Sequence, residues 1–235
     1  MEDGILLEKL TGFGLTRQEA TLYLSLCRNG EMTGYEASKL TGISRSNVYN
    51  SLSGLVEKGA AYKREETASK YVAVDVAEFC RNRIRRMEED KAYLTCHVLR
   101  PETATEGYLT IAGPRHIRNK ASNMLAQTQY RIYLSAPSAF VAAVRKELQS
   151  LLEQGKKVVI LTEQNPQLEG ALFYQKETLE NQLRLIVDSS YVLTGEAGMA
   201  QSDTCLYTGQ KNFVSVFKEA LRNEIKLIEL TRSLG

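Results

Sequence analysis

Residues 33–59 read TGYEASKLTGISRSNVYNSLSGLVEKG, and this stretch contains the signals for two helices joined by a short corner. Thr33 and Glu36 have the spacing of a capping box, in which the hydroxyl and the carboxylate each satisfy a free backbone N–H group. We predict a first helix from about residue 34 to residue 40. It should end at Gly42, because a left-handed C-cap costs glycine little.

The second helix is predicted from residue 45 to about residue 58, with Ile43 turned inward before it and Ser44 as its N-cap. Its apolar residues recur with helical spacing and form one face: Val48, Leu52, Leu55 and Val56. The opposite face carries small or amide side chains: Ser46, Asn47, Asn50, Ser53 and Gly54. Two short helices around a glycine-containing turn, the second one polar outside, are typical of a helix-turn-helix. An ordinary helical hairpin is the alternative.

The flanking segments extend this pattern to a winged helix. A second capping box, Thr16 with Glu19, opens a helix predicted over residues 17–28. Its expected buried stripe is Ala20, Tyr23, Leu24 and Cys27, and the apolar residues 5–10 should pack across the domain. Downstream, residues 60–75 read AAYKREETASKYVAVD, in which two Tyr/Val-containing segments bracket a polar turn. This pattern predicts a hairpin, the wing.

Candidate DNA contacts follow from these positions, with double-stranded DNA as the partner. In the second helix, Ser44 lies at the start, Arg45 is a candidate for a guanine or phosphate contact, and Tyr49 for a phosphate or packing contact. The candidates for hydrogen bonds to base edges are Ser46, Asn47 and Asn50. On the wing, the candidates for salt-dependent phosphate contacts are Lys63, Arg64 and Lys70. A solvated hairpin is the alternative for these three cations.

A long helix is predicted over residues 76–98. Seven positions, all apolar except Lys91, follow alternating spacings of three and four: Ala77, Cys80, Ile84, Met87, Lys91, Leu94 and Val98. This heptad-like seam favours a dimerisation coil or a strut between domains, and a surface helix packed within one domain is the alternative. The predicted domains are residues 1–75 (winged helix), 76–100 (connecting helix) and 107–235, with residues 99–107 as a linker.

The C-terminal domain alternates strands and helices, which predicts an α/β sandwich around a mostly buried sheet. Strands are expected at YLTIAG, RIYLSAP, KKVVILTE, QLRLIVD, YVLTGE and TCLYTG. Helices are expected over residues 116–127, 140–154 and 212–230, with a looser segment over residues 164–181. The fold class is therefore α+β in the first domain and α/β in the second.

Composition narrows the class of protein. Of 235 residues, 43% are hydrophobic and 25% charged, and the net charge is +2, so there is no global basic field and any DNA contact depends on local placement. The four cysteines lie far apart, which favours free thiols in a cytoplasmic protein with no metal site. The sequence has no signal-peptide pattern and no apolar run long enough for a membrane span. No nucleotide-binding or metalloprotease motif is present, and no cofactor is expected.

The N-terminal half resembles the TrmB family of winged-helix transcriptional regulators. The resemblance rests on LTRQEATLYLSLCRNG (residues 15–30) and on the 33–59 stretch, most specifically on GISRSNVY (residues 42–49). The C-terminal domain resembles the phospholipase-D-like domain that follows the winged helix in this family, including a D-x-x-x-x-x-x-G run from Asp188 to Gly195. Sugar-sensing members carry a further effector domain. This chain ends soon after residue 230, so we expect that domain to be missing and carry over no sugar ligand.

The resemblance also permits a test for catalysis. Phospholipase D chemistry uses His-x-Lys-x-x-x-x-Asp, in which the imidazole attacks phosphorus and the lysine stabilises its oxygens. With Asp188 at the acid position, Asn181 occupies the histidine position and Leu183 the lysine position. No catalytic residue is therefore predicted, and the protein is expected not to be an enzyme. Asp188 and Thr194 remain candidates for binding an unknown small-molecule effector at a strand-end cleft.

These observations predict a cytoplasmic, homodimeric, sequence-specific DNA-binding transcriptional regulator. Its C-terminal domain would serve dimerisation and possible effector sensing. Two alternatives from other classes stay open: a phosphodiesterase of the phospholipase D superfamily, and a protein-interaction adaptor whose winged helix does not bind DNA.

Overall fold

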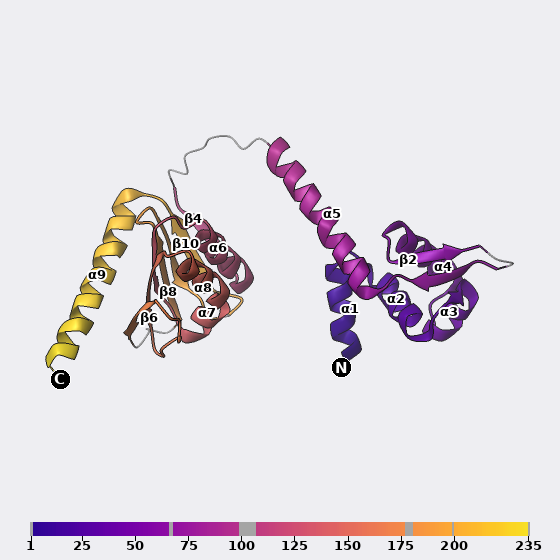
Figure 1. Cartoon of the computed structure of the whole chain (residues 1–235), viewed down its shortest axis with the longest axis horizontal. Helices are drawn as coiled ribbons and strands as arrows, with labels where there is room; N and C mark the ends of the chain where they lie inside the picture. The colour runs from indigo at the N-terminus through magenta and orange to yellow at the C-terminus, as the bar shows by residue number, and fades with distance from the viewer. Residues whose placement is uncertain (1, 66–67, 99–106, 177–180, 199, 235) are drawn as a thin grey trace. The chain divides into compact units, whose positions relative to one another are not determined.

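The computed structural model describes residues 2–65, 68–98, 107–176, 181–198 and 200–234. The chain divides into two units, Met1–Pro101 and Glu102–Gly235, and each is described by itself (Figure 1). The predicted linker, residues 99–107, lies outside the described residues except for Gly107.

The first unit is a winged helix-turn-helix followed by a long helix, as predicted. Its helices are α1 (Glu2–Gly12), α2 (Arg17–Asn29), α3 (Gly34–Thr41), α4 (Arg45–Glu57) and α5 (Val76–His97). Its strands are β1 (Met32–Thr33), β2 (Ala61–Arg64) and β3 (Lys70–Ala73). The antiparallel sheet has the order β1-β3-β2, and β2 with β3 forms the wing.

One hydrophobic core holds the first unit together. Its largest fully buried side chains come from α2, α4 and α5: Leu22, Tyr23, Leu26, Leu52, Leu55 and Phe79. The Tyr23 hydroxyl donates a 2.8 Å hydrogen bond to the Val74 carbonyl, so the ring fixes the end of the wing to α2. Phe79 packs against Tyr23 at a centroid distance of 5.7 Å and anchors the first turns of α5.

Three expectations about this core were only partly right. In α2 the predicted Ala20 and Tyr23 are fully buried, but Leu22 and Leu26 complete the buried stripe in place of Leu24, which is half-buried, and Cys27, which is exposed. In α4, Val56 lies at the edge of the buried face and is exposed. The N-terminal segment forms the helix α1, which packs Leu7 and Leu10 on the core of the first unit but leaves Ile5 and Leu6 exposed.

The second unit is built on a seven-stranded mixed sheet, β4-β10-β9-β8-β5-β6-β7. Its strands are β4 (Leu109–Ala112), β5 (Arg131–Ser135), β6 (Lys157–Thr162), β7 (Leu172–Gln175), β8 (Gln182–Val187), β9 (Tyr191–Glu196) and β10 (Thr204–Thr208). Strands β5, β6 and β7 run parallel to one another, and the remaining pairings are antiparallel.

Helices cover both faces of this sheet, which confirms the predicted sandwich (Figure 1). On one face lie α6 (Pro114–Ala126), α7 (Ser138–Ala143) and α8 (Arg145–Glu153), over a core that includes Ile132, Leu134 and Leu183. The other face is covered by α9 (Lys211–Leu234), which packs Val214 and Leu221 against Val159, Leu161, Ile186 and Val192.

Two expectations about the second unit were wrong. Residues 140–154 form two helices, because the backbone leaves the helical region at the buried Val144 (φ −109°, ψ 17°). The break lets Phe140 before it and Leu148 after it both reach the core. The looser segment contains the strand β7, a short edge strand that pairs only with β6. The residues of β7 are exposed or half-buried and do not alternate between apolar and polar, so the sequence carries no strand pattern here.

Candidate nucleic-acid interface

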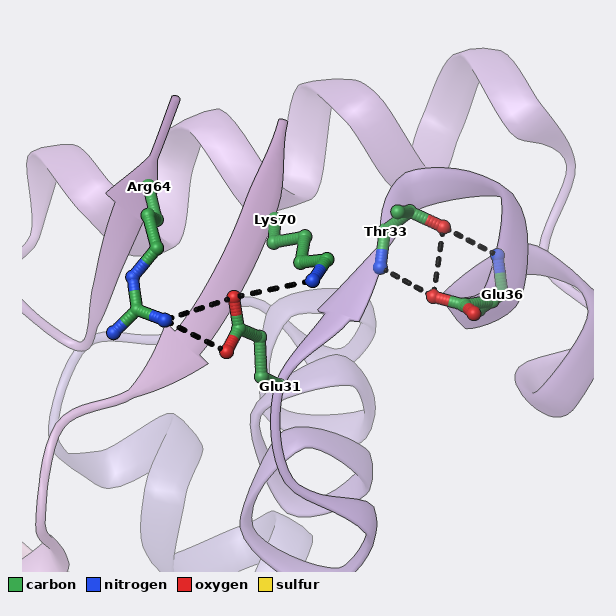
Figure 2. A network of polar contacts seen from close by, with 5 residues as sticks. All are labelled: Glu31, Thr33, Glu36, Arg64 and Lys70. Carbon is green, nitrogen blue, oxygen red and sulfur yellow. Dashed lines mark hydrogen bonds and ion pairs between the residues drawn. The ribbon is translucent and has the colours of Figure 1, made fainter. Parts of the chain in front are cut away.

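The corner between α3 and α4 is fixed by local hydrogen bonds. Oε2 of Glu36 accepts from the Thr33 backbone N–H at 2.8 Å and from its hydroxyl at 2.9 Å, and the Thr33 hydroxyl accepts from the Glu36 N–H at 3.3 Å (Figure 2). These bonds hold the pKa of Glu36 below its usual value. Gly42 adopts the predicted left-handed conformation at φ 71°, and the Ser38 hydroxyl donates to the Ile43 carbonyl at 2.7 Å.

Ser44 is at the N-cap position of α4, but its side chain does not cap the helix. Its Oγ lies 3.4 Å from Oγ of Ser46, so the two hydroxyls are directed toward each other and not toward the first-turn N–H groups. The first turn of α4 therefore has backbone donors that no side chain of the cap satisfies, at a position where the chain is exposed. Helix N-termini of this kind attract phosphate oxygens.

The outer face of α4 is exposed at every position proposed for DNA contact: Ser44, Arg45, Ser46, Asn47, Tyr49 and Asn50. Val48, Leu52 and Leu55 on the opposite side have no exposed surface, so the helix cannot rotate without losing its anchors. Gly54, which we had placed on the outer face, is half-buried against the carboxylate of Glu19. The Glu19 side chain needs the space that a Cβ would take.

Two aromatic rings support the outer face, and only Tyr49 was predicted from the sequence. The Arg45 guanidinium lies 4.8 Å from the centroid of Tyr35, an exposed residue of α3. The Tyr49 ring packs on Gly34, where an added Cβ would lie 2.5 Å from Cε1. Tyr35 was missed; its only signal in the sequence is an aromatic residue in the first turn of α3, the helix that crosses the DNA backbone in such motifs.

The wing carries the three predicted cations, and each has an acidic neighbour. Nη1 of Arg64 lies 3.1 Å from Oε2 of Glu31, and Nζ of Lys70 lies 3.9 Å from Oε1 of the same carboxylate (Figure 2). Nζ of Lys63 lies 3.0 Å from Oε1 of Glu65, which raises the pKa of the lysine. Glu31 precedes β1, and Arg64 and Lys70 are cross-strand partners, so the sheet register brings this group together.

A further basic residue of the winged helix, Lys58, has a structural role. Nζ of Lys58, just past α4, lies 2.6 Å from Oε2 of Glu19 and donates to the Gly14 carbonyl at 3.0 Å. Only 8% of the Glu19 side chain is exposed. Burial acts to raise the pKa of Glu19, but the bonds from Lys58 and Thr16 bring it below its usual value. This pair ties the C-terminal end of α4 to the start of α2.

The two effector candidates of the second unit are not brought together. Asp188 follows β8 and accepts three backbone N–H bonds, from Gln129, Tyr130 and Arg131, at 2.7, 2.8 and 2.9 Å. Burial opposes ionisation of Asp188, but these donors hold its pKa below the usual value. Thr194 lies in β9 opposite Arg184, near the other end of β8.

The positions that correspond to the phospholipase D motif have structural surroundings. Leu183 is fully buried in the core, opposite Gly195. Asn181 has φ 61°, and its carbonyl accepts from the Ala197 N–H at 2.8 Å. Within the described part of the chain, no group of three or more His, Cys, Asp or Glu side chains could hold a metal ion, and no helix is long and apolar enough to cross a membrane.

A winged helix with an exposed polar second helix defines a class, the helix-turn-helix DNA-binding regulators. The chain belongs within this class to the TrmB family. Residues 10–77 match the family described as "Sugar-specific transcriptional regulator TrmB". Residues 108–220 match the N-terminal subdomain of the TrmB effector-binding domain. The further effector domain of sugar-sensing members was expected to be missing, with possible effector sensing left to the C-terminal domain; the second unit matches the N-terminal subdomain of the TrmB effector-binding domain.

Two proteins are similar to this chain in sequence. The chain is 26% identical over 239 residues to YrhO of Bacillus subtilis (strain 168), covering 97% of this chain and 86% of YrhO. It is 25% identical over 169 residues to TrmBL1 of Pyrococcus furiosus, an HTH-type sugar sensing transcriptional regulator, covering 68% of this chain and 47% of TrmBL1. The chain thus spans about half of that regulator.

Solved structures with a similar fold include TrmBL2, an archaeal chromatin protein, with a TM-score of 0.47 and 20% identity over 96% of this chain and 99% of that one. Nuc of Salmonella typhimurium, a phospholipase D family member, has a TM-score of 0.41 and 14% identity over 50% of this chain and 92% of that one.

Proposed function

We propose that this protein is a sequence-specific regulator that inserts the outer face of α4 into the major groove of double-stranded DNA. The observation that carries the proposal is the exposure of Arg45, Asn47 and Asn50 on a helix whose other side is fully buried. Arginine can bond a guanine bidentately, and asparagine an adenine. The stacking of Arg45 on Tyr35 limits the guanidinium to fewer orientations before DNA arrives.

The wing is proposed to lie along the DNA backbone. Lys63, Arg64 and Lys70 are its cations, and all three are exposed or half-buried. Because acidic side chains lie beside them, we expect a modest electrostatic contribution, and base contacts by α4 must supply most of the specificity. The same pairing of cations with acidic side chains is what favours the alternative, a protein-interaction adaptor whose winged helix does not bind DNA.

A homodimer through α5 is proposed. Beyond Phe79, the seam positions Ile84, Met87, Leu94 and Val98 are each at least 47% exposed. Apolar residues with heptad-like spacing on one exposed helix are suited to pairing with a second copy of the same helix. Two copies would present two α4 helices to two half-sites, as in other helix-turn-helix dimers.

The second unit is proposed to sense an effector without catalysing phosphodiester hydrolysis. Asparagine at position 181 is no adequate nucleophile, and the buried Leu183 offers no charge to a phosphoryl oxygen. The relationship to the TrmB effector-binding domain supports the sensing role.

The test is selection of genomic DNA fragments by the purified chain, followed by affinity measurements at several salt concentrations. We expect an enriched, two-fold symmetric sequence that binds at least about a thousandfold more tightly than scrambled DNA. Equal affinity for the enriched and scrambled duplexes would contradict sequence-specific recognition. An absence of salt-dependent binding to any duplex would favour the adaptor.

A further inference from the structure

The face of the sheet that α9 covers contains a cavity of about 280 Å³. Its floor is formed by apolar and aromatic side chains of β5 to β8, among them Tyr133, Val159 and Leu172. Its wall is α9, which contributes Leu221 and Ile225. This volume lies just below the usual range for ligand-binding pockets, about 300 to 1,000 Å³, and therefore suits a small ligand.

Four cationic side chains line this cavity: Lys157, Lys218, Arg222 and Lys226. The three on α9 are spaced four residues apart and lie on one stripe of the helix. Lys157 begins β6, and Val159 and Leu161 of the same strand face α9, so Lys157 is on this face too. We name these four residues the α9 cation cluster.

The α9 cation cluster places four positive charges beside a single carboxylate in the lining of the cavity. In the described ranges of the chain, none of its members forms a salt bridge or side-chain hydrogen bond, unlike the wing cations. The one carboxylate in the lining, Glu229, accepts a 2.7 Å hydrogen bond from the Tyr174 hydroxyl. Elsewhere on α9, Glu224 is held between Lys176 at 3.0 Å and Arg184 at 2.8 Å.

The sheet adds a further positive charge beside the cluster. Arg131 of β5 is the cross-strand neighbour of Lys157, and it shares the parity of Tyr133, which packs on the α9 side. Like charges at paired positions of neighbouring strands repel each other. A bound anion would offset this repulsion.

From this geometry we infer that the cavity under α9 binds the phosphate group of a small organic phosphate, with the apolar part of the ligand on Tyr133, Val159 and Leu172. Several cations around one opening suit a doubly charged group better than a single carboxylate. The small size of the cavity, about 280 Å³, favours a small molecule over a nucleic-acid backbone, which would need an extended surface. Phosphate binding is inferred from the cavity alone; a regulatory role for that binding rests on the proposed effector-sensing function.

The experiment uses the full chain and three probes at constant ionic strength: inorganic phosphate, phenyl phosphate and phenol. Binding is followed by amide chemical shifts in β5, β6 and α9. Contacts from a few exposed cations should give inorganic phosphate a dissociation constant on the order of 1 mM. Phenyl phosphate should bind more tightly than inorganic phosphate, and phenol most weakly.

The double variant Lys157→Gln/Arg222→Gln should weaken binding of both phosphates about tenfold. The matched control is Lys146→Gln/Lys211→Gln, which removes the same charge at exposed positions that do not line the cavity. Its affinities should stay within about twofold of the wild-type values. Equal losses in both double variants, equal binding of phenol and phenyl phosphate, or no shifts with inorganic phosphate would overturn the inference.

Two outcomes separate this inference from the proposed function. Operator binding without ligand should be unchanged in Lys157→Gln/Arg222→Gln, so a protein that binds phosphate but no operator sinks only the DNA-binding proposal. If scrambled duplex DNA produces the same shifts in β6 and α9, and the double variant loses them, the cluster is a DNA-backbone site and the small-ligand inference is wrong.

Discussion

At the scale of the residue, Arg45 gives the most direct test of DNA recognition by α4. It lies over Tyr35 and contributes nothing to the core. We expect Arg45→Ala to weaken binding to the selected sequence by about 1–3 kcal/mol if the guanidinium contacts a base bidentately. The measurement is a duplex titration, with Arg17→Ala, an exposed arginine at the start of α2, as the matched control. Unchanged operator affinity in a folded Arg45→Ala protein would show that Arg45 makes no base contact.

Glu31 lies beside two of the three wing cations, Arg64 and Lys70, and was not predicted from the sequence. Its carboxylate competes with DNA phosphates for Arg64. Glu31→Gln should therefore increase affinity for scrambled DNA roughly two- to fivefold at low salt. The plot of log affinity against log salt should become steeper by about 0.9 for each added phosphate contact. Glu8→Gln, an exposed change on α1, controls for net charge. Weaker binding by Glu31→Gln would mean that Glu31 orients the wing cations for DNA.

Glu19 links the stability of the first unit to pH. Its folded-state pKa lies below the ordinary value of about 4.3, so its ion pair with Lys58 stabilises the fold above that pH. The stabilisation is lost as the pH falls through the folded-state pKa. Glu19→Gln should lower the free energy of unfolding by roughly 1–3 kcal/mol at pH 7, and the difference from wild type should shrink toward pH 3. Urea unfolding at several pH values measures it; a difference that does not depend on pH would contradict this role.

At the scale of the element, α5 has two parts with different surroundings. Near the start of α5, Phe79 is buried in the core of the first unit, whereas Met87 and Leu94 further along the helix are more than half exposed. Met87→Asp should impair dimerisation, because a seam position would then bury an unpaired carboxylate. Sedimentation equilibrium measures the effect, and Arg86→Asp places the same side chain outside the seam. Met87→Asp dimers that are as stable as wild type would locate the interface elsewhere. Loss of the dimer should also weaken operator binding.

At the scale of the whole molecule, Asp188 distinguishes a regulator from an enzyme. Its carboxylate already satisfies three backbone donors, which explains its place at the end of β8 without catalysis. We expect no turnover of a panel of phosphodiesters by the wild-type chain. Asp188→Ala should lower the free energy of unfolding of the second unit by roughly 1–3 kcal/mol, because the donors lose their acceptors. Wild-type turnover that disappears in Asp188→Ala would overturn the regulator-only proposal.

The order of elements in both units was predictable because it depends on local interactions. The capping boxes of α2 and α3 and the left-handed Gly42 join residues at most four positions apart. Hydrophobic spacing located α4, α5 and most strands for the same reason. The edge strand β7 and the break at Val144 escaped prediction, because pairing with β6 and packing on the sheet decide them.

The sequence by itself determined the winged helix, the exposed outer face of α4 and the lack of a histidine and lysine where a phosphodiesterase would need them. The tertiary structure decided what surrounds those residues. Glu31 meets Arg64 from 33 positions away, and Asp188 reaches the backbone of residues 129–131 across 57 to 59 positions. The α9 cation cluster likewise exists only because α9 packs on β6. Such contacts join residues that are far apart in the sequence and come together only when each unit folds, so no local spacing predicts them.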